Sequence, residues 1–374
     1  MPQIDLDDED GTLAMLRDSV AAFATTTGGA TSLRERRAAG SDLDLAQWRA
    51  MADAGWVGLT LPEDLGGVGL GLREQVVLSE SIGRALLTEP LAQLGVFSSV
   101  LLAASGPGET RDRLARGLAD GSRIVSQVWQ DTRGRRHPLD ASLTGETVTI
   151  DGTGHLVAAP RTATDFLVMA RTGKELMLVA VDAKTPGFSH SLRPTVDGSM
   201  IGSADFEGCT VPTDQILCRN TQVETAFADA IEATRLALAS ELAGLGARAL
   251  EITVEFTKER VQFGKPIASF QTIQHRLVDM WSDSEFACAA QANAVETLAD
   301  NPGLAASLAI LAAKARAGDA AVSITRRAIH LHGAMGFTDE CDISLYMKRA
   351  TNLNATLGQS EELRLEFVSR ERAA

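Results

Sequence analysis

The chain has 374 residues, of which 45% are apolar and 22% are charged, and its formal net charge at pH 7 is −14. A chain of this length and composition can bury a large core and is expected to form two or three domains. The acidic balance argues against a general nucleic-acid-binding protein, because phosphate backbones attract clustered cations. It does not exclude an anionic cofactor held by a few arginines.

The cysteine pattern and the hydropathy of the chain limit the cellular compartments in which we expect the protein. Cys209, Cys218, Cys288 and Cys341 form no C-x-x-C pair, so their spacing predicts neither a zinc site nor a disulfide framework. The acidic first ten residues lack the apolar core of a signal peptide, and no run approaches the roughly 18 apolar residues of a membrane span. We therefore expect a cytoplasmic protein with no metal site and no membrane segment.

Residues 1–122 are expected to form an N-terminal helical domain. Apolar residues recur at helical spacing in 12–24 and again in 43–54, where Trp48 and Met51 mark the buried face. Residues 55–70 are crowded with glycine, and no phosphate-binding lysine follows them. This segment therefore predicts tight turns and close helix packing. Helical spacing returns at Leu72.

A central β domain is expected over residues 123–218, where short apolar runs are separated by Gly, Pro and Asp without a helical period. The runs are 124–128, 148–150, 166–170, 176–181 and 203–206. Residues 219–374 return to helical spacing, in alanine-rich segments at 226–259, 270–299 and 304–331. The order of helices, strands and helices predicts an α+β protein.

The most informative segment interrupts the last helical region and reads Arg260-Val-Gln-Phe-Gly-Lys-Pro-Ile-Ala-Ser-Phe-Gln271. Gly264 and Pro266 are expected to end one helix before the next begins near Ser269. A guanidinium fork, an amide and an aromatic ring stand together at this break, beside free backbone N–H groups. That set suits a dinucleotide. The alternative is a helix corner with a solvated arginine.

This segment, followed by Leu277-Val-Asp-Met280, resembles the signature helix corner of the acyl-CoA dehydrogenase family. The glycine-rich loop at 55–70 and the order of the domains are also similar, so the resemblance covers nearly the whole chain. It implies an N-terminal helical domain, a central β-barrel-like domain and a C-terminal four-helix bundle. It also implies a flavoprotein of lipid or steroid degradation that dehydrogenates acyl-CoA thioesters with FAD.

The resemblance implies that this corner binds the ADP half of FAD. In the family the corresponding Arg, Gln and Phe bind it across a subunit interface, which points here to Arg260, Gln262 and Phe263, with Gln271 close by. The chain is therefore expected to form a homo-oligomer or a hetero-oligomer.

A second grip in the family is a Gln-x-x-Gly-Gly-x-Gly turn from the neighbouring subunit. Gly333 and Gly336 match it, whereas His330 replaces the Gln and Ala334 replaces a Gly. Because His can donate and accept hydrogen bonds, we expect an altered flavin site at this turn. The alternative is that His330 and His332 only line a helix end.

The acyl-CoA end of the predicted site is less distinct. Glu232 and Arg235 lie three residues apart and share a helix face. The family places an acidic residue and an Arg here against the CoA thioester, so the resemblance implies that these two residues bind substrate. The alternative is an ordinary surface ion pair.

The catalytic base of the family has no counterpart. Most members use the Glu of a Tyr-Glu-Gly-Thr segment, and that position is Leu357 here; a minority place the Glu one residue before the matched Arg235, and that position is Thr234. Glu241 is a weak candidate, because it lies about two helical turns, ~10 Å, further along the helix. A polar contact within the helix bundle suits it better.

The segments that surround the reactive end of the flavin in the family have also changed. Residues 125–136 lack the Thr-Glu-Pro-x-x-Gly-Ser-Asp motif, and residues 155–160 read His-Leu-Val-Ala-Ala-Pro. A known type of heterotetrameric acyl-CoA dehydrogenase, which acts on steroid side chains, pairs a base-bearing subunit with one that lacks the base. The chain resembles the subunit without the base.

Two other hypotheses remain open from the sequence. The chain could be a self-sufficient homo-oligomeric dehydrogenase with a displaced base such as Glu241 or Asp131. It could also be a relative that binds flavin or protein partners without catalysis. Nucleic acid is disfavoured as a partner by the acidic charge.

Overall fold

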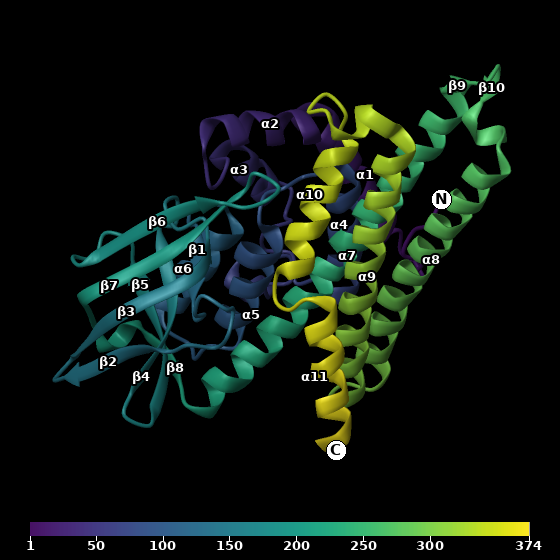
Figure 1. Ribbon diagram of the computed structural model, residues 1–374. Helices are drawn as coiled ribbons and strands as arrows, with labels where there is room; N and C mark the ends of the chain where they lie inside the picture. The colour runs from purple at the N-terminus through teal and green to yellow at the C-terminus, as the bar shows by residue number, and fades with distance from the viewer. Residues whose placement is uncertain (374) are drawn as a thin grey trace. The chain divides into compact units, whose positions relative to one another are not determined.

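The computed structural model describes residues 1–373 and consists of two compact units (Figure 1). The helical unit combines Met1–Arg34 and Leu72–Thr88 with the chain from Arg235 onwards, and the second unit combines Glu35–Gly71 with Glu89–Thr234. Strands of the main sheet run from Val125 to Arg219. The predicted α+β class is confirmed, whereas the predicted three-domain boundaries stay a prediction.

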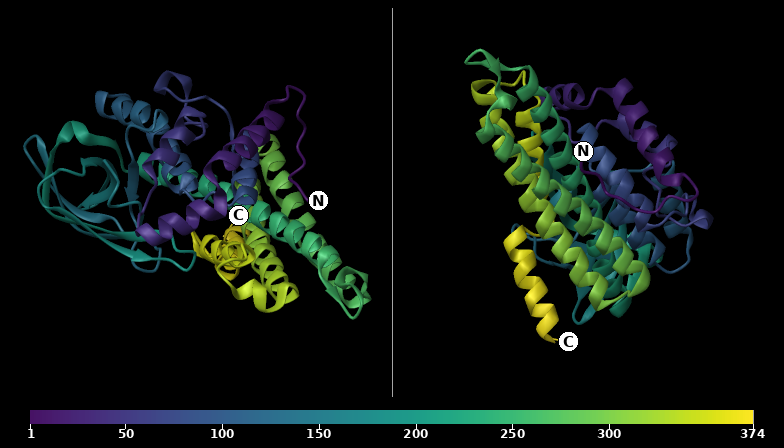
Figure 2. Two further views of the ribbon diagram at one scale, coloured as in Figure 1. Left: turned by 90° about the horizontal axis from the view of Figure 1, so that it is seen from above. Right: turned by 90° about the vertical axis from the view of Figure 1, so that its right-hand side faces the viewer.

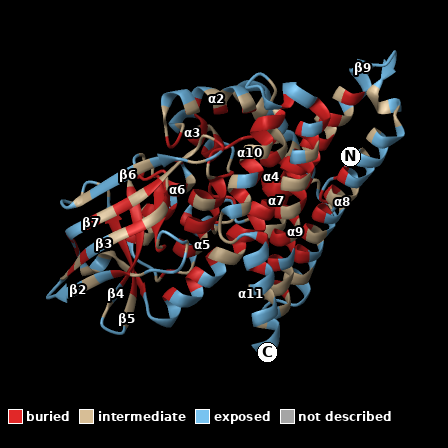
Figure 3. Ribbon diagram, in the orientation of Figure 1, coloured by how far each residue is buried: buried red, intermediate tan, exposed pale blue. Residues whose placement is uncertain are grey.

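Long helices form the helical unit, as their apolar spacing predicts. They are α1 Thr12–Thr27, α4 Leu72–Ala85, α7 Thr221–Glu259, α8 Gln271–Asp300, α9 Leu304–His332, α10 Ile343–Ala355 and α11 Ser360–Ala373, with α7 entering from the second unit. Helices α8 and α9 run side by side (Figure 2). Their alanine-rich facing surfaces allow close packing, and Figure 3 shows the buried residues along them.

Helices α4 and α7 cross in close contact at two glycines. A Cβ atom on Gly83 would lie 2.1 Å from the carbonyl oxygen of Glu241, and one on Gly244 would lie 2.0 Å from that of Glu80. Any larger residue would force the two backbones apart. The crossing therefore depends on glycine at both positions.

The second unit contains an eight-stranded sheet in the order β6-β7-β3-β2-β4-β5-β8, with β1 paired to β4. The pairs β1–β4 and β2–β4 are parallel, and the pairs β2–β3, β3–β7, β6–β7, β4–β5 and β5–β8 are antiparallel. The strands are β1 Val125–Val128, β2 Leu139–Thr144, β3 Thr147–Ala158, β4 Asp165–Thr172, β5 Glu175–Asp182, β6 Phe188–Pro194, β7 Met200–Pro212 and β8 Ile216–Arg219.

Apolar residues of several strands meet in one buried cluster inside this unit. Phe166, Val168, Met177 and Phe206 belong to it, and the rings of Phe166 and Phe206 pack edge to face at 6.0 Å. Strand β4 is buried through its first six residues, which explains its continuous apolar run. The helices of this unit include α3 Leu45–Asp53, α5 Ser98–Ala103 and α6 Glu109–Ala119, while α2 Gly29–Ala39 begins in the helical unit and ends here.

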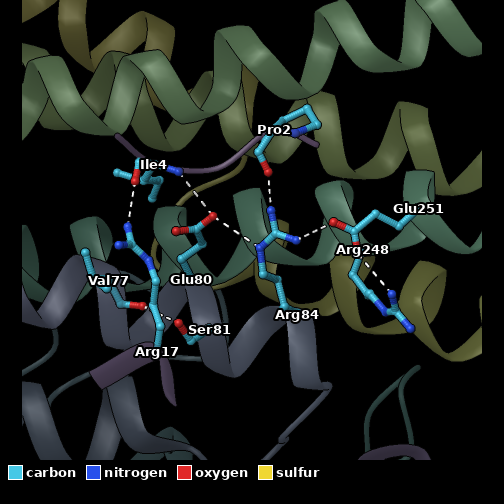
Figure 4. A network of polar contacts seen from close by, with 9 residues as sticks. All are labelled: Pro2, Ile4, Arg17, Val77, Glu80, Ser81, Arg84, Arg248 and Glu251. Atoms are coloured by element: carbon cyan, nitrogen blue, oxygen red, sulfur yellow. Dashed lines mark hydrogen bonds and ion pairs between the residues drawn. The ribbon is translucent and has the colours of Figure 1, made fainter. Parts of the chain in front are cut away.

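The amino-terminal segment is held to the helical unit by a polar network (Figure 4). Arg84 donates to the carbonyl of Pro2 and, at 2.7 Å, to the carboxylate of Glu251. Arg17 donates to the carbonyl of Ile4 at 2.8 Å, and the Ile4 side chain is fully buried. These bonds satisfy backbone groups that would otherwise be buried without partners.

Glu80 lies at the centre of this network. Its Oε1 accepts from the Ile4 N–H at 3.2 Å and from Arg84 at 3.3 Å, whereas its buried Oε2 has no hydrogen-bond partner among the described residues. Burial raises the pKa of Glu80 and outweighs the opposing influence of Arg84. The folded protein therefore binds a proton at Glu80 more tightly than the unfolded chain does.

Replacing Glu80 with Gln tests this assignment. A raised folded-state pKa gives a contribution to stability that is complete below the unfolded pKa and is lost as pH rises through the folded value. The free energy of unfolding of Glu80→Gln, relative to the parent, should therefore rise between about pH 5 and about pH 8. Denaturant unfolding at both values measures it, and a difference that is constant or falls with pH would contradict the assignment.

Candidate functional site

The predicted dinucleotide corner is a two-strand hairpin at the end of α7. Strand β9 Val261–Gln262 pairs with β10 Lys265–Pro266, and a short turn Ile267–Ser269 leads into α8. The two residues of the hairpin loop, Phe263 and Gly264, both have positive φ, at 52° and 77°. Glycine tolerates this conformation, whereas a phenylalanine in it carries strain of about 1–2 kcal/mol.

The side chains of Arg260, Gln262 and Phe263 are exposed. Phe263 is 92% exposed, and its only ring contact among the described residues is an edge-on approach to Phe270 at 6.1 Å. No described residue binds the guanidinium of Arg260, and the amide of Gln262 bonds only the adjacent Val261 carbonyl. An exposed ring, an unpaired cation and an amide fit an external aromatic and anionic group such as FAD.

The second predicted flavin element lies at the end of α9, and Figure 1 shows this end and the β9–β10 hairpin on the same side of the helical unit. His330 is exposed on the last turn of α9, and Gly333 begins a short turn with φ of 65°. Gly336 is buried, and a Cβ atom there would lie 2.8 Å from the Ile329 carbonyl oxygen. The matched glycines thus sit where the backbone needs them, with His330 free to face a ligand.

His332 behaves differently from His330. Its ring is buried and stacks on Phe256 of α7, with 4.1 Å between the ring centroids and 12° between their planes. Burial lowers the pKa of His332, so the ring is neutral at neutral pH. The hypothesis that both histidines merely line a helix end therefore describes His332 better than His330.

Arg235 is bound within the chain. Its Nη1 and Nη2 donate to the two carboxylate oxygens of Glu366 at 3.1 and 2.8 Å, and its Nε donates to the Leu357 carbonyl at 2.9 Å. Although burial opposes it, Arg235 holds the pKa of Glu366 below its ordinary value. The guanidinium fork that the sequence offers to a substrate is thus occupied by Glu366. Glu232 is half-buried, and substrate binding by both residues stays a prediction.

A buried lysine holds the same loop from another side. Lys314 on α9 is fully buried, and its ammonium donates to the carbonyls of Leu353, Asn354 and Gly358 at 3.1, 3.2 and 3.4 Å. Burial lowers the pKa of Lys314 to about 7. The sequence reading did not identify Lys314; its position as a lone cation among alanines on the buried face of α9 is a usable signal.

The two positions that carry the base in the resembled family cannot take a proton here. Leu357 has φ of 55°, and the bonds from Arg235 and Lys314 to the adjacent carbonyls fix it in this strained conformation. Thr234 is fully buried, and its hydroxyl has no partner among the described residues. A hydroxyl is far too weak a base to remove a carbon-bound proton without an activating group.

The two displaced candidates are also poorly suited to proton abstraction. Glu241 is buried in an ion pair with Arg349, whose Nε and Nη2 donate to the same carboxylate oxygen at 3.0 and 2.7 Å. Hydrogen bonds from backbone N–H groups, of which that of Arg135 has the largest effect, lower the pKa of Asp131. A carboxylate with a lowered pKa is a weaker base. Asp131 instead closes the exposed turn that follows β1.

Comparison with known proteins assigns the family. Residues 11–122 match the acyl-CoA dehydrogenase N-terminal domain and residues 225–371 match the acyl-CoA dehydrogenase C-terminal domain, which together cover most of the chain. The chain belongs to the acyl-CoA dehydrogenase family, whose members are FAD-dependent oxidoreductases acting on CH–CH bonds. The expected family, fold and cofactor class are thereby confirmed.

Particular relatives refine this placement. Acyl-CoA dehydrogenase IpdE2 of Mycobacterium tuberculosis is 29% identical over 90% of this chain and 90% of its own, and FadE27 of the same organism is 27% identical over 84% and 85%. Among solved structures, a variant of the Tcur3481–Tcur3483 steroid acyl-CoA dehydrogenase is 28% identical, with a TM-score of 0.85 and coverage of 97% and 99%. The ChsE4–ChsE5 complex of M. tuberculosis shares the fold at 24% identity, with a TM-score of 0.88 and coverage of 99% of each chain.

None of the helices within residues 1–373 is long and apolar enough to cross a membrane.

Replacing Phe263 with Asn tests whether this side chain contributes to the stability of the isolated chain. Asn adopts positive φ more readily than Phe, and the exposed ring contributes little burial. We expect the free energy of unfolding of the isolated chain to stay equal or to rise by up to about 1 kcal/mol. Denaturant unfolding measures this, and a clear loss of stability would show that the ring supports the fold of the isolated chain.

Proposed function

We propose that this chain is the subunit of a hetero-oligomeric acyl-CoA dehydrogenase that helps to bind FAD and contributes no catalytic base. The observation that carries the proposal is the contrast between two parts of the helical unit. Arg260, Gln262 and Phe263 are exposed and poised for a ligand, whereas the base position is Leu357 in a loop fixed by Arg235 and Lys314.

The reaction requires both parts. Dehydrogenation beside a thioester removes a proton from Cα while a hydride leaves Cβ, and bound FAD supplies the acceptor for that hydride. This chain would hold the ADP half of FAD with Arg260, Gln262, Phe263 and Gln271, and His330 with Gly333 and Gly336 would form the second grip. The proton must then be removed by a carboxylate of a partner subunit.

Exposed apolar side chains support an oligomer. Val261 and Phe263 of the hairpin and Met335 and Phe337 of the turn after α9 are exposed, as are Val278, Trp281 and Phe286 on α8. Contiguous exposed apolar patches mark protein interfaces, and these residues gather on the hairpin, on the helix α8 that follows it and on the turn after α9. Val261 and Phe263, and likewise Met335 and Phe337, adjoin the residues proposed to hold FAD along the chain, as a cofactor site shared between subunits requires.

The comparisons favour a different acyl-CoA dehydrogenase chain as the partner. The Tcur3481–Tcur3483 steroid enzyme, whose name gives two components, is 28% identical to this chain over nearly its whole length. The ChsE4–ChsE5 complex also has two named components and shares the fold. By this likeness we extend the proposal to an acyl-CoA thioester substrate of lipid or steroid degradation. The four free thiols support a cytoplasmic setting.

A self-sufficient enzyme is the second hypothesis, and it requires a displaced base. Glu241 would have to leave its buried bonds with Arg349, and breaking a buried pair typically costs about 3–5 kcal/mol. Asp131 would have to act despite a lowered pKa. A purely binding role, the third hypothesis, leaves the family's chemistry unused, and no described feature favours it.

Dye-linked dehydrogenation of butyryl-, octanoyl- and steroid side-chain CoA thioesters tests the proposal. We expect no turnover by the isolated chain and clear turnover when it is co-expressed with a base-bearing acyl-CoA dehydrogenase subunit. A Glu241→Gln change in this chain should leave the activity of the folded complex within a few-fold of the parent, because the partner provides the base.

Strong turnover by the isolated chain would contradict the proposal. If Glu241→Gln then abolished that turnover while the protein remained folded, the displaced base would be Glu241 and the self-sufficient hypothesis would hold.

A further inference from the structure

One cysteine differs from the other three in its surroundings. Cys209, Cys218 and Cys288 are buried, and burial raises the pKa of each thiol, to about 11 for Cys218 and about 12 for Cys288. Such thiols are poor nucleophiles, because the thiolate is the reactive form. Cys341 is partly exposed, in the segment between the turn after α9 and the start of α10.

A neighbouring imidazole is placed to activate Cys341. The sulfur lies 3.7 Å from Nδ1 of His332, and the stack on Phe256 fixes the orientation of that ring. More than nine-tenths of His332 is buried, and its Nε2 has no hydrogen-bond partner among the described residues. The Cys341 thiol is therefore the one hydrogen-bonding partner of the ring within residues 1–373.

Either tautomer of the neutral ring activates the sulfur. With the proton on Nε2, Nδ1 accepts the thiol proton; with the proton on Nδ1, the ring donates to the sulfur and stabilises the thiolate. Burial lowers the pKa of His332, so the ring is neutral at neutral pH and can accept a hydrogen bond, although the same burial makes it a weaker proton acceptor than an exposed imidazole. A partly exposed thiol beside a fixed imidazole is the arrangement of an activated cysteine.

We propose that Cys341 and His332 form a reactive thiol site that takes low-molecular-weight disulfides by exchange. The thiol proton passes to Nδ1 of His332, and the Cys341 sulfur attacks one sulfur of the disulfide. A new sulfur–sulfur bond forms as the original one breaks, so the protein thiol is oxidised and the departing thiolate is reduced. The imidazole returns its proton to solvent, and no further oxidant is needed.

The position of this site links it to flavin binding. The Cys341 N–H donates to the Thr338 carbonyl, and the Thr338 N–H donates to the Met335 carbonyl. Cys341 is thus hydrogen-bonded to the segment that follows the turn Gly333–Phe337, and a group added to its sulfur would disturb that turn. Under the proposed function this turn is one grip on FAD. Modification would then weaken flavin retention by the complex, and this consequence rests on the proposed function.

The thiol chemistry is tested on the full chain with the aromatic disulfide dithiobis-nitrobenzoate, by following the released chromophore. We expect one fast thiol and three that react on the order of 100-fold more slowly. Cys341→Ser should remove the fast phase. His332→Phe, which keeps a ring against Phe256, should slow it by on the order of tenfold or more, whereas the control His275→Phe on the exposed side of α8 should not.

Thermal unfolding shows whether His332→Phe retains the fold, and mass mapping of the trapped parent protein identifies the modified cysteine without any variant. A fast phase that maps to another cysteine or survives Cys341→Ser would overturn the site. An unchanged rate in a folded His332→Phe would overturn the role of the imidazole.

The flavin consequence is measured separately, on the co-expressed complex after treatment with the same disulfide. We expect the treated parent complex to lose flavin on gel filtration and the treated Cys341→Ser complex to keep it. Equal retention would remove the consequence while leaving the thiol site intact. A complex that holds no flavin before treatment would contradict the proposed function instead.

Discussion

Two buried cations bound to main-chain carbonyls fix the loop that contains the predicted base position. Arg235 and Lys314 approach the segment 353–358 from different helices. Arg235 donates to the carbonyl of the strained residue Leu357, and Lys314 donates to carbonyls on either side of it, including those of Leu353 and Gly358. Carbonyl oxygens satisfy a buried ammonium without a counter-charge, at the expense of a pKa lowered to about 7. These bonds hold the loop in place around Leu357, an apolar residue at the position where the sequence resemblance predicts the base.

A loop that is held in place but lacks a catalytic base fits a subunit that retains the family fold while a partner subunit supplies the base. The glycine crossing of α4 and α7 and the buried Glu241–Arg349 pair stabilise the same helical unit without offering a proton acceptor. The hairpin differs from these parts, because Phe263 combines a positive φ with a ring that is almost fully exposed. Strain of this kind persists where a binding partner makes use of it.

Much of the fold could be predicted from the sequence, because the helical periods of α7, α8 and α9 are long and regular. The edge strand β6 could not, since its exposed side chains leave no apolar alternation to recognise. Strand β3 continues past its predicted end at Ile150 through register shifts at Gly152 and Gly154, where the apolar pattern breaks.

The site could be predicted only in part. The corner at 260–271 carries a compact motif, so its residues were identifiable from local sequence. The bonds of Arg235 to Glu366 and of Lys314 to Gly358 join positions far apart in the chain, and only tertiary structure shows them. The contact between His332 and Cys341 is closer in sequence, but it depends on the turn that begins at Gly333.

The visible absorption spectrum of the purified chain, alone and in complex with a base-bearing acyl-CoA dehydrogenase subunit, tests the central claim most directly. The account predicts flavin bands in the complex and little or none in the chain alone, because a shared FAD site is complete only in the assembly. Stoichiometric flavin in the chain alone would contradict it and would show that the site is complete within copies of this chain.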